Sequence, residues 1–262
     1  MTPGLRRVFE EHRDERAQEL YEIANLLDKQ ALTTDSGPIR RAAFQCKGGF
    51  KSDGQRQYWG FEIAELQIKL GDQRHGRPQS AIMQDCIGAL SVKVEEYVPN
   101  DQDSVGHSFE LLREATVDFH FDAYHEIGGE IFPLRAAWHL DTHAYSNQAD
   151  RGVHPRFHFQ VGGDRLAEID SDIRGVLMSD SPRLPCAPLD GILAVDFVLS
   201  NYCGKKWNEL KDNLPGYLRL RKSPIQRYWF PYFRMIADSI EKLDSVPGGG
   251  EGYLLLPNIS CG

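Results

Sequence analysis

Residues 116–124 (TVDFHFDAY), 134–145 (LRAAWHLDTHAY) and 154–161 (HPRFHFQV) decide the fold that this sequence predicts. Side chains alternate between the two faces of a strand, so residues two apart share a face. In each segment one set of alternate positions is mainly apolar, and the other carries histidine, aspartate, arginine or glutamine. The segments therefore predict three successive antiparallel strands with one face in the core and one polar face.

A tight turn between the first two of these strands predicts how they pair. Gly128-Gly129 supplies the permissive backbone of a two-residue turn. With the turn at that pair, Asp122 lies opposite Arg135, and Asp118 lies opposite His139. Opposite charges then meet across the strands, which supports this pairing.

The third strand follows a longer loop at residues 146–153, so its register is less fixed. In one register Asp141 faces His158, and His143 faces Arg156. A shift by two residues would keep the same side chains on the polar face and stays open as an alternative.

The whole chain predicts an α+β protein. Its 262 residues are enough to bury a full core. We expect an antiparallel β-sheet of about five to seven strands, with a long N-terminal helix and C-terminal helices packed on one face. The expected layout is a single domain over 1–262, with the N-terminal helix in 1–35, the antiparallel sheet in 41–163 and the helical layer in 185–245. A domain boundary near residues 163–181 is the alternative.

Two local patterns refine this layout. Residues 43–46 and 57–70 flank glycine-containing turns and predict a hairpin. A helix that is apolar nearly all round begins near Leu189 or Asp190, and we expect it to be buried against the sheet. Asp196 lies within that run, where it either is buried with a partner such as an arginine or occupies a narrow exposed edge. The exposed edge is the expected position.

Composition limits the class of protein. The formal net charge of −8 argues against attraction of the whole surface to nucleic acid or to an anionic membrane. No apolar run approaches the roughly 20 residues that span a bilayer, and the charged residues 10–16 exclude a secretory apolar segment. We therefore expect a cytoplasmic protein with no membrane contact. The five cysteines include no C-x-x-C pair, so neither a disulfide framework nor a thiolate zinc site is expected.

Histidines gather on the predicted polar face: seven of the nine lie between residues 107 and 158. His139, Asp141 and His143 fall on one face of one strand, with Cα atoms about 6.5 to 7 Å apart. Imidazole and carboxylate are both metal ligands, so a divalent metal could bind there. Further ligands could come from His158, Asp118 or His120. The spacing departs from known metal motifs, because no distal histidine follows His158 as it would in a facial-triad oxygenase.

Acid and base catalysis without a metal is the second chemical interpretation of these residues. Two imidazoles on either side of a phosphodiester can remove and donate protons, while an arginine holds the developing charge. The candidate catalytic residues are His139, His143, His158, Asp141 and Asp118, and the candidate substrate-binding residues are Arg135, Arg156, His120 and His154. A solvated sheet face with structural cross-strand ion pairs would produce the same pattern and is the competing explanation.

Residues 217–234 offer a second candidate surface. Ser223-Pro224 predicts the first turn of a final helix, which Pro231 should bend or split. Five basic side chains alternate there with aromatic ones, a combination that suits stacking on bases and neutralising phosphates. The basic residues are Arg219, Arg221, Lys222, Arg227 and Arg234. The favoured interpretation is structural, with the aromatic side chains in the core and the basic ones on the wet side of a helix.

The sequence thus leads to two functional hypotheses. The first is a phosphoester-directed hydrolase, for example a nuclease-like enzyme. It would act on nucleic acid or a nucleotide through the histidine-rich face. The second is a non-catalytic binding or assembly subunit, whose protein partner docks on the N-terminal helix or on residues 217–234. In the first hypothesis, catalysis by a bound divalent metal is one of the two chemical routes.

Overall fold

The structure combines one antiparallel sheet with helices near both ends of the chain. The computed structural model describes residues 3–70, 81–82, 86–98, 111–142, 157–162 and 184–244. The strands are β1 (Lys51–Ser52), β2 (Gln57–Lys69), β3 (Ala81–Ile82), β4 (Ile87–Tyr97), β5 (Leu112–Ile127), β6 (Glu130–Thr142), β7 (Phe157–Val161) and β8 (Leu184–Pro185). The helices are α1 (Pro3–Lys29), α2 (Gly37–Cys46), α5 (Gly191–Tyr202), α6 (Gly204–Asn213), α7 (Pro215–Pro224), the π-helical segment η2 (Ile225–Trp229) and α8 (Phe230–Asp244).

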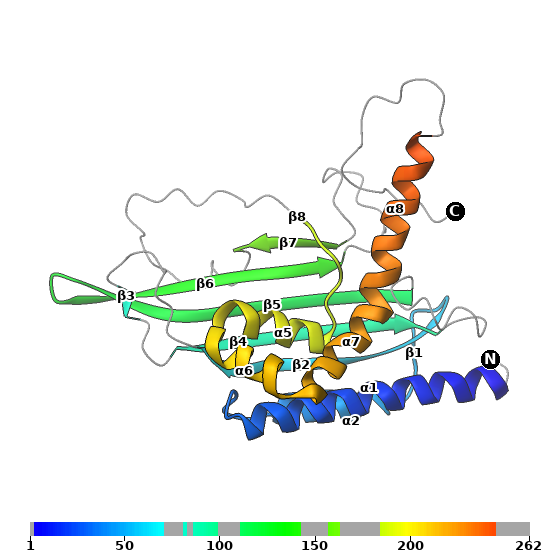
Figure 1. Ribbon diagram of the computed structural model, residues 1–262, viewed down its shortest axis with the longest axis horizontal. Coiled ribbons are helices and arrows are strands. Elements are labelled where there is room, and N and C mark those ends of the chain that lie inside the picture. The colour runs from blue at the N-terminus through cyan, green and yellow to red at the C-terminus, as the bar shows by residue number, and fades with distance from the viewer. Residues whose placement is uncertain are drawn as a thin grey trace.

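The sheet has the order β1-β2-β4-β5-β6-β7-β8, and β3 pairs with β5. Among the eight strands of the described residues, three have only two residues, so the other five form the body of the sheet. Helices α1, α2 and α5 pack against the sheet, and α8 extends away from it (Figure 1). The expected α+β class is confirmed. Among the described helices, none is long and apolar enough to cross a membrane.

The alternation in β5 and β6 sorts their side chains as predicted. Val117, Phe119 and Phe121 are at most 8% exposed and belong to the core. Trp138 of β6 lies on the same side and donates its Nε1 hydrogen to the hydroxyl of Tyr202 in α5, at 3.0 Å. One face of the sheet is thus closed by the helices. The opposite face, formed by the other alternate residues of β2 and β4 to β7, is called the polar face below.

The expectation that residues 43–46 form a hairpin strand, and that the sheet begins at residue 41, is wrong. These residues end helix α2. Pro38 lies in the first turn of α2, a position that proline favours, and the Asp35 carboxylate accepts the N–H of Gly37 at 2.7 Å beside the N-cap Ser36. Helical spacing also explains the buried face of α2, which consists of Pro38, Ile39, Ala42, Ala43 and Cys46.

The helix predicted to begin near Leu189 or Asp190 is confirmed as α5. Asp190 is its N-cap, and one carboxylate oxygen accepts the N–H groups of Ile192 and Leu193 at 3.0 and 2.9 Å. A Cβ atom on Gly191 would lie 3.0 Å from Ile63 of β2, so glycine lets the helix start close to the sheet.

The final helix begins earlier than predicted. Pro224 does not open a helix; it ends α7, which continues through the π-helical segment into α8. The Phe230 N–H reaches back five residues to the Ile225 carbonyl. Pro231 lacks an N–H, and its ring clashes with the carbonyl four residues earlier. The bend or break expected at Pro231 therefore takes the form of a widened, π-helical turn before it.

Close packing between β2 and β4 generates a stability prediction. A Cβ atom on Gly60 would lie 2.3 Å from the Val94 carbonyl oxygen, a backbone atom that cannot turn away. We expect Gly60→Ala to lower the free energy of unfolding by about 1–3 kcal/mol because the strands must move apart. Urea denaturation measures the change. Gly49→Ala is the control, since no atom lies within 4 Å of its added Cβ; equal stabilities of the two variants would contradict the prediction.

Candidate functional site

The strand register of the polar face agrees with the sequence prediction. Asp122 pairs with Arg135, and Asp118 pairs with His139, across β5 and β6. Asp141 of β6 pairs with His158 of β7, which is one of the two registers that the sequence allows. Antiparallel pairing therefore brings histidines and carboxylates of three neighbouring strands onto one surface.

His139, Asp141 and His158 form the tightest group on the polar face, called the histidine cluster below. One ligand atom from each lies within 4.8 Å of the others. The His139 Nε2 and Asp141 Oδ2 atoms are 3.3 Å apart. The two imidazole rings meet edge to face, with centroids 6.1 Å apart. His158 is 1% exposed, whereas about a third of the Asp141 side chain is open to solvent.

The structure places the remaining candidate residues around this cluster or outside it. Asp118 and Gln160 are the pairing partners of His139 on either side, in β5 and β7. His120 pairs with Ala137 and does not belong to the histidine cluster. The candidates His143, His154 and Arg156 lie outside the described residues.

Arg135, a candidate phosphate ligand, is already engaged by a carboxylate. Its Nε and Nη2 atoms donate to the two oxygens of Asp122 at 2.6 and 3.0 Å. The hydrogen bonds from Arg135 lower the pKa of Asp122, against a smaller effect of burial. A phosphate bound by Arg135 would therefore share the guanidinium with Asp122.

A buried polar network lies on the other side of the sheet, between α1, β4 and the C-terminal helices. Arg16 of α1 donates to the Tyr228 hydroxyl at 2.9 Å, and that hydroxyl donates to Glu96 of β4. All three residues are at most 2% exposed. The His12 Nε2 atom lies 3.5 Å from the second oxygen of Glu96. The network thus links the first helix to the sheet and to η2.

Two further carboxylates and a second arginine extend this buried network. Arg16 Nη1 is 3.5 Å from Glu19 and 3.7 Å from Asp190. Arg227 is 2.9 Å from Glu19 and 3.8 Å from Asp190. Burial raises the pKa of Asp190, and it raises the pKa of Glu19 to about 7 despite the opposing effect of Arg16.

Sequence reasoning missed this network, although α1 carried a signal. Arg13 and Arg16 fall in the same helical stripe as Phe9, Leu20 and Ile23, and this stripe is buried. An arginine within an apolar stripe requires buried acceptors. The partners, however, lie in β4, in η2 and before α5, and no local pattern identifies them. Because the network joins α1, β4, η2 and the N-cap of α5, it is assigned a structural role.

Asp196 is buried, so its expected position at an exposed edge is wrong. It accepts hydrogen bonds from Trp207 at 2.9 Å and from Tyr217 at 2.6 Å. Its ion-pair partner is Arg221 of α7, at 2.9 Å, and not an arginine of the sheet. Asp196 therefore holds α5, α6 and α7 together.

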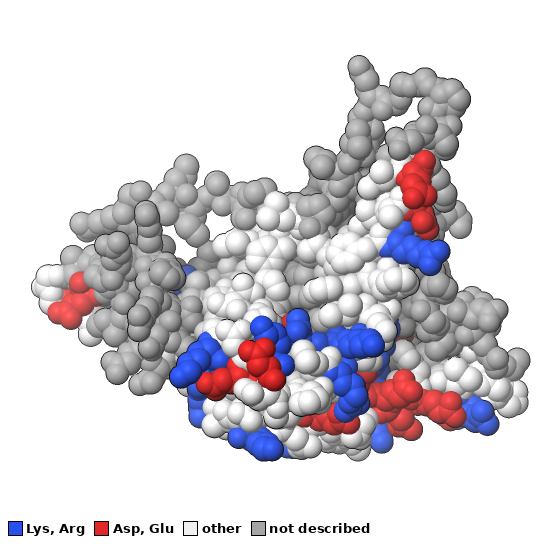
Figure 2. Space-filling model, in the orientation of Figure 1, with Lys and Arg blue, Asp and Glu red and all other residues white. Residues whose placement is uncertain are grey.

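The basic and aromatic residues of 217–234 serve mainly this helical packing. Tyr217, Tyr228 and Tyr232 are buried in the core. Arg219 pairs with Glu22, and Arg221 and Arg227 pair with the carboxylates described above. Figure 2 shows the side of the molecule on which the helices lie, and there Lys and Arg side chains lie beside those of Asp and Glu. These contacts support the structural interpretation of the segment.

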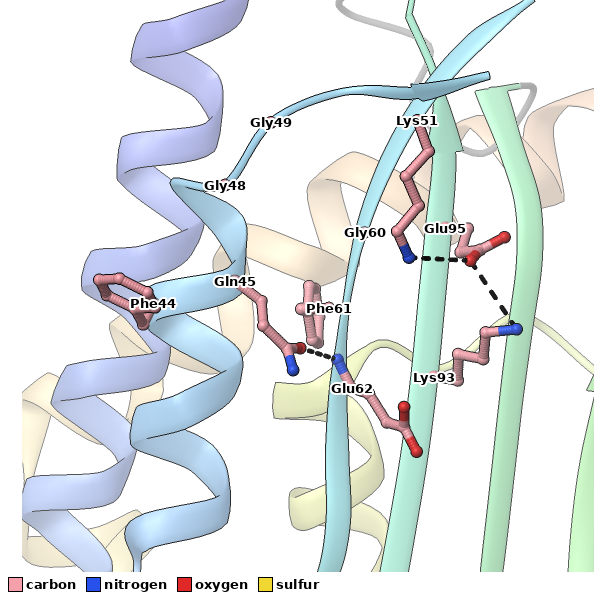
Figure 3. Close-up of a pocket in the computed structure, with 10 residues that line it drawn as sticks. All are labelled: Phe44, Gln45, Gly48, Gly49, Lys51, Gly60, Phe61, Glu62, Lys93 and Glu95. Carbon is pink, nitrogen blue, oxygen red and sulfur yellow. Dashed lines mark hydrogen bonds and ion pairs between the residues drawn. The ribbon is translucent and has the colours of Figure 1, made fainter. Parts of the chain in front are cut away.

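A pocket of about 400 Å³ lies at another corner of the polar face, between α2, β1, β2 and β4 (Figure 3). The Nζ atoms of Lys51 and Lys93 each lie 3.8 Å from the same oxygen of Glu95. Gln45 accepts the backbone N–H of Glu62 at 2.6 Å at its rim. The two lysines are thus paired with Glu95, and β5 separates the pocket from the strands of the histidine cluster.

Comparisons with protein-family models, with curated proteins and with solved structures found no match for this chain. A fold alone does not determine a function, because functions reside in sites. The function is therefore inferred from the polar face, where imidazoles and carboxylates converge.

The raised pKa of Glu19 predicts a pH-dependent stability. Between pH 4.5 and about 7 the folded protein keeps a proton on Glu19 that the unfolded chain releases. The stabilising contribution of Glu19 is thus complete below pH 4.5 and is lost as the pH rises through 7. Relative to Glu19→Gln, we expect the free energy of unfolding of the wild type to fall by on the order of 3 kcal/mol over this range.

Urea denaturation at a series of pH values measures this difference. Glu10→Gln is the control, because Glu10 forms an exposed ion pair with Arg6 on the same helix, and exposed pairs contribute little to stability. Parallel stability curves for the wild type and Glu19→Gln would contradict the prediction.

Proposed function

We propose that the protein is a cytoplasmic hydrolase that binds and cleaves a phosphoester on the polar face of its sheet. The supporting observation is the convergence of His139, Asp141 and His158 within 4.8 Å, on two paired strands. Imidazole and carboxylate groups at this separation are suited to activating a water molecule against a phosphorus centre.

The chemistry of these groups allows two routes to hydrolysis. In one, one imidazole removes a proton from water and the other protonates the leaving oxygen, as their edge-to-face arrangement 6.1 Å apart permits. In the other, the three side chains hold a metal ion that activates the water. Asp118, paired with His139, would orient its imidazole in either route.

The charges of the chain favour a small or locally bound substrate. A net charge of −8 repels long polyanions at a distance, so a nucleotide or a short single-stranded segment fits better than duplex nucleic acid. Arg135 lies four residues from His139 on β6, or about 13 Å along the strand. We infer that it contacts a phosphate remote from the bond being cleaved, while it keeps its pair with Asp122.

The second candidate function is a binding or assembly subunit, and helix α8 favours it. Phe230, Phe233 and Ile240 are 62%, 53% and 53% exposed. They are spaced by three and seven residues, which places them on one side of the helix. An apolar strip on a helix that extends from the body is typical of a surface that docks a protein partner.

Hydrolysis assays with matched variants separate the two functions. Substrates would be bis-p-nitrophenyl phosphate, cyclic nucleotides, single-stranded RNA and single-stranded DNA, with Mg²⁺, Mn²⁺ or Zn²⁺. We expect turnover on at least one substrate, and a fall in kcat/KM of about 100-fold or more in His139→Ala and His158→Asn.

Glu62→Gln serves as the control, because Glu62 is exposed on β2 of the same face and lies outside the cluster. Circular dichroism and thermal melting would establish that each variant is folded. Full activity in folded His139→Ala and His158→Asn would overturn the assignment of the site. No turnover on the whole panel, together with a stable copurifying partner, would favour the assembly subunit.

A further inference from the structure

We propose that His139, Asp141 and His158 form a binding site for one divalent transition-metal ion, with Zn²⁺ as the best-fitting example. As a catalytic element this site rests on the proposed function. As a binding site it is tested by itself, without any substrate. A metal ion at this site would favour the metal-dependent route to hydrolysis over the metal-free route described above.

The first argument is the ligand set. Two imidazoles and one carboxylate suit Zn²⁺, Co²⁺, Ni²⁺ or Fe²⁺, whereas Mg²⁺ and Ca²⁺ prefer oxygen ligands alone. Three protein ligands leave at least one coordination position for water, as in catalytic zinc sites. Asp141, whose side chain is about one-third exposed, lies on the side from which water can approach.

The second argument is distance. Ligand atoms held about 2.1 Å from a tetrahedral ion are about 3.4 Å from each other. His139 Nε2 and Asp141 Oδ2 are already 3.3 Å apart. The His158 ligand atom lies within 4.8 Å of both, so a shift of at most about 1.4 Å brings it to the separation that a bound ion requires.

The third argument is the framework that holds the ligands. His139 and Asp141 are two residues apart on β6, and Asp141 pairs directly with His158 on β7. Strands paired within a sheet position side chains more accurately than loops do. Asp118, which pairs with His139 from β5, can accept a hydrogen bond from the ring nitrogen that does not bind the metal.

A simple ion pair explains less of the geometry. A pair between His139 and Asp141 accounts for the 3.3 Å contact, since these two are ion-pair partners. A metal ion also makes use of the second imidazole, which is 1% exposed and has a ligand atom within 4.8 Å of both. Burying an imidazole beside another imidazole becomes favourable when both coordinate the same cation.

Metal titration of the full chain tests the site. Purified protein would be treated with a chelator, dialysed, and titrated with Zn²⁺ by calorimetry and with Co²⁺ by visible absorption. We expect one ion per chain, and an increase in Tm on binding. We expect His139→Ala, Asp141→Asn and His158→Asn to weaken binding by at least about 100-fold, because the first and third remove an imidazole ligand and the second removes the charge of the carboxylate ligand.

Glu62→Gln is the matched control, because Glu62 carries an exposed carboxylate on the same face but lies outside the cluster; it should bind one ion as the wild type does. Absence of stoichiometric binding, or binding that survives in folded Asp141→Asn and His158→Asn, would overturn the metal site. Hydrolysis that persists after complete metal removal would also overturn its catalytic role and would leave the imidazole route. Metal binding without hydrolysis of any substrate would support the site and contradict the proposed hydrolase.

Discussion

The pairing register of β5, β6 and β7 is the constraint on which the rest of the structure depends. Because side chains alternate along a strand, a shift of one residue would move Phe119 and Trp138 out of the core and bury Asp118 and His139 in their place. The free-energy cost of exposing these apolar side chains and burying the polar ones therefore fixes the register. The same constraint assembles the histidine cluster, because the face opposite a buried apolar surface has to carry the polar side chains.

Burial of charge on the helical side sets the second constraint. Arg16 and Glu96 are nearly inaccessible, and each is costly to bury without the other. Tyr228 of η2 lies between them and thereby links η2 to α1 and to β4. The pKa of Arg16 is raised even though burial opposes the change, because Tyr228 and the surrounding carboxylates favour its charged form. The helices are thereby fixed over one face of the sheet.

Local patterns predict the parts of the structure that depend on neighbours in sequence. The alternation of β5 and β6, together with the Gly128-Gly129 turn, is sufficient to predict their pairing correctly. The short α2 was missed because ten residues with few polar positions fit a strand as well as a helix. Asp196 was misplaced because its two hydrogen-bond donors and its ion-pair partner come from two later helices, and contacts at such separations leave no periodic pattern.

The histidine cluster differs from the buried carboxylates of the helical side in the partner of its carboxylate, and this difference locates the chemistry. On the helical side, Asp196, Glu19 and Asp190 each have an arginine within 4 Å, so these charges hold helices in place. In the histidine cluster, the ion-pair partner of Asp141 among the described residues is an imidazole. An imidazole can exchange a proton or bind a metal near neutral pH, which a guanidinium cannot do. For this reason the polar face, and not the basic and aromatic segment at 217–234, carries the functional proposal.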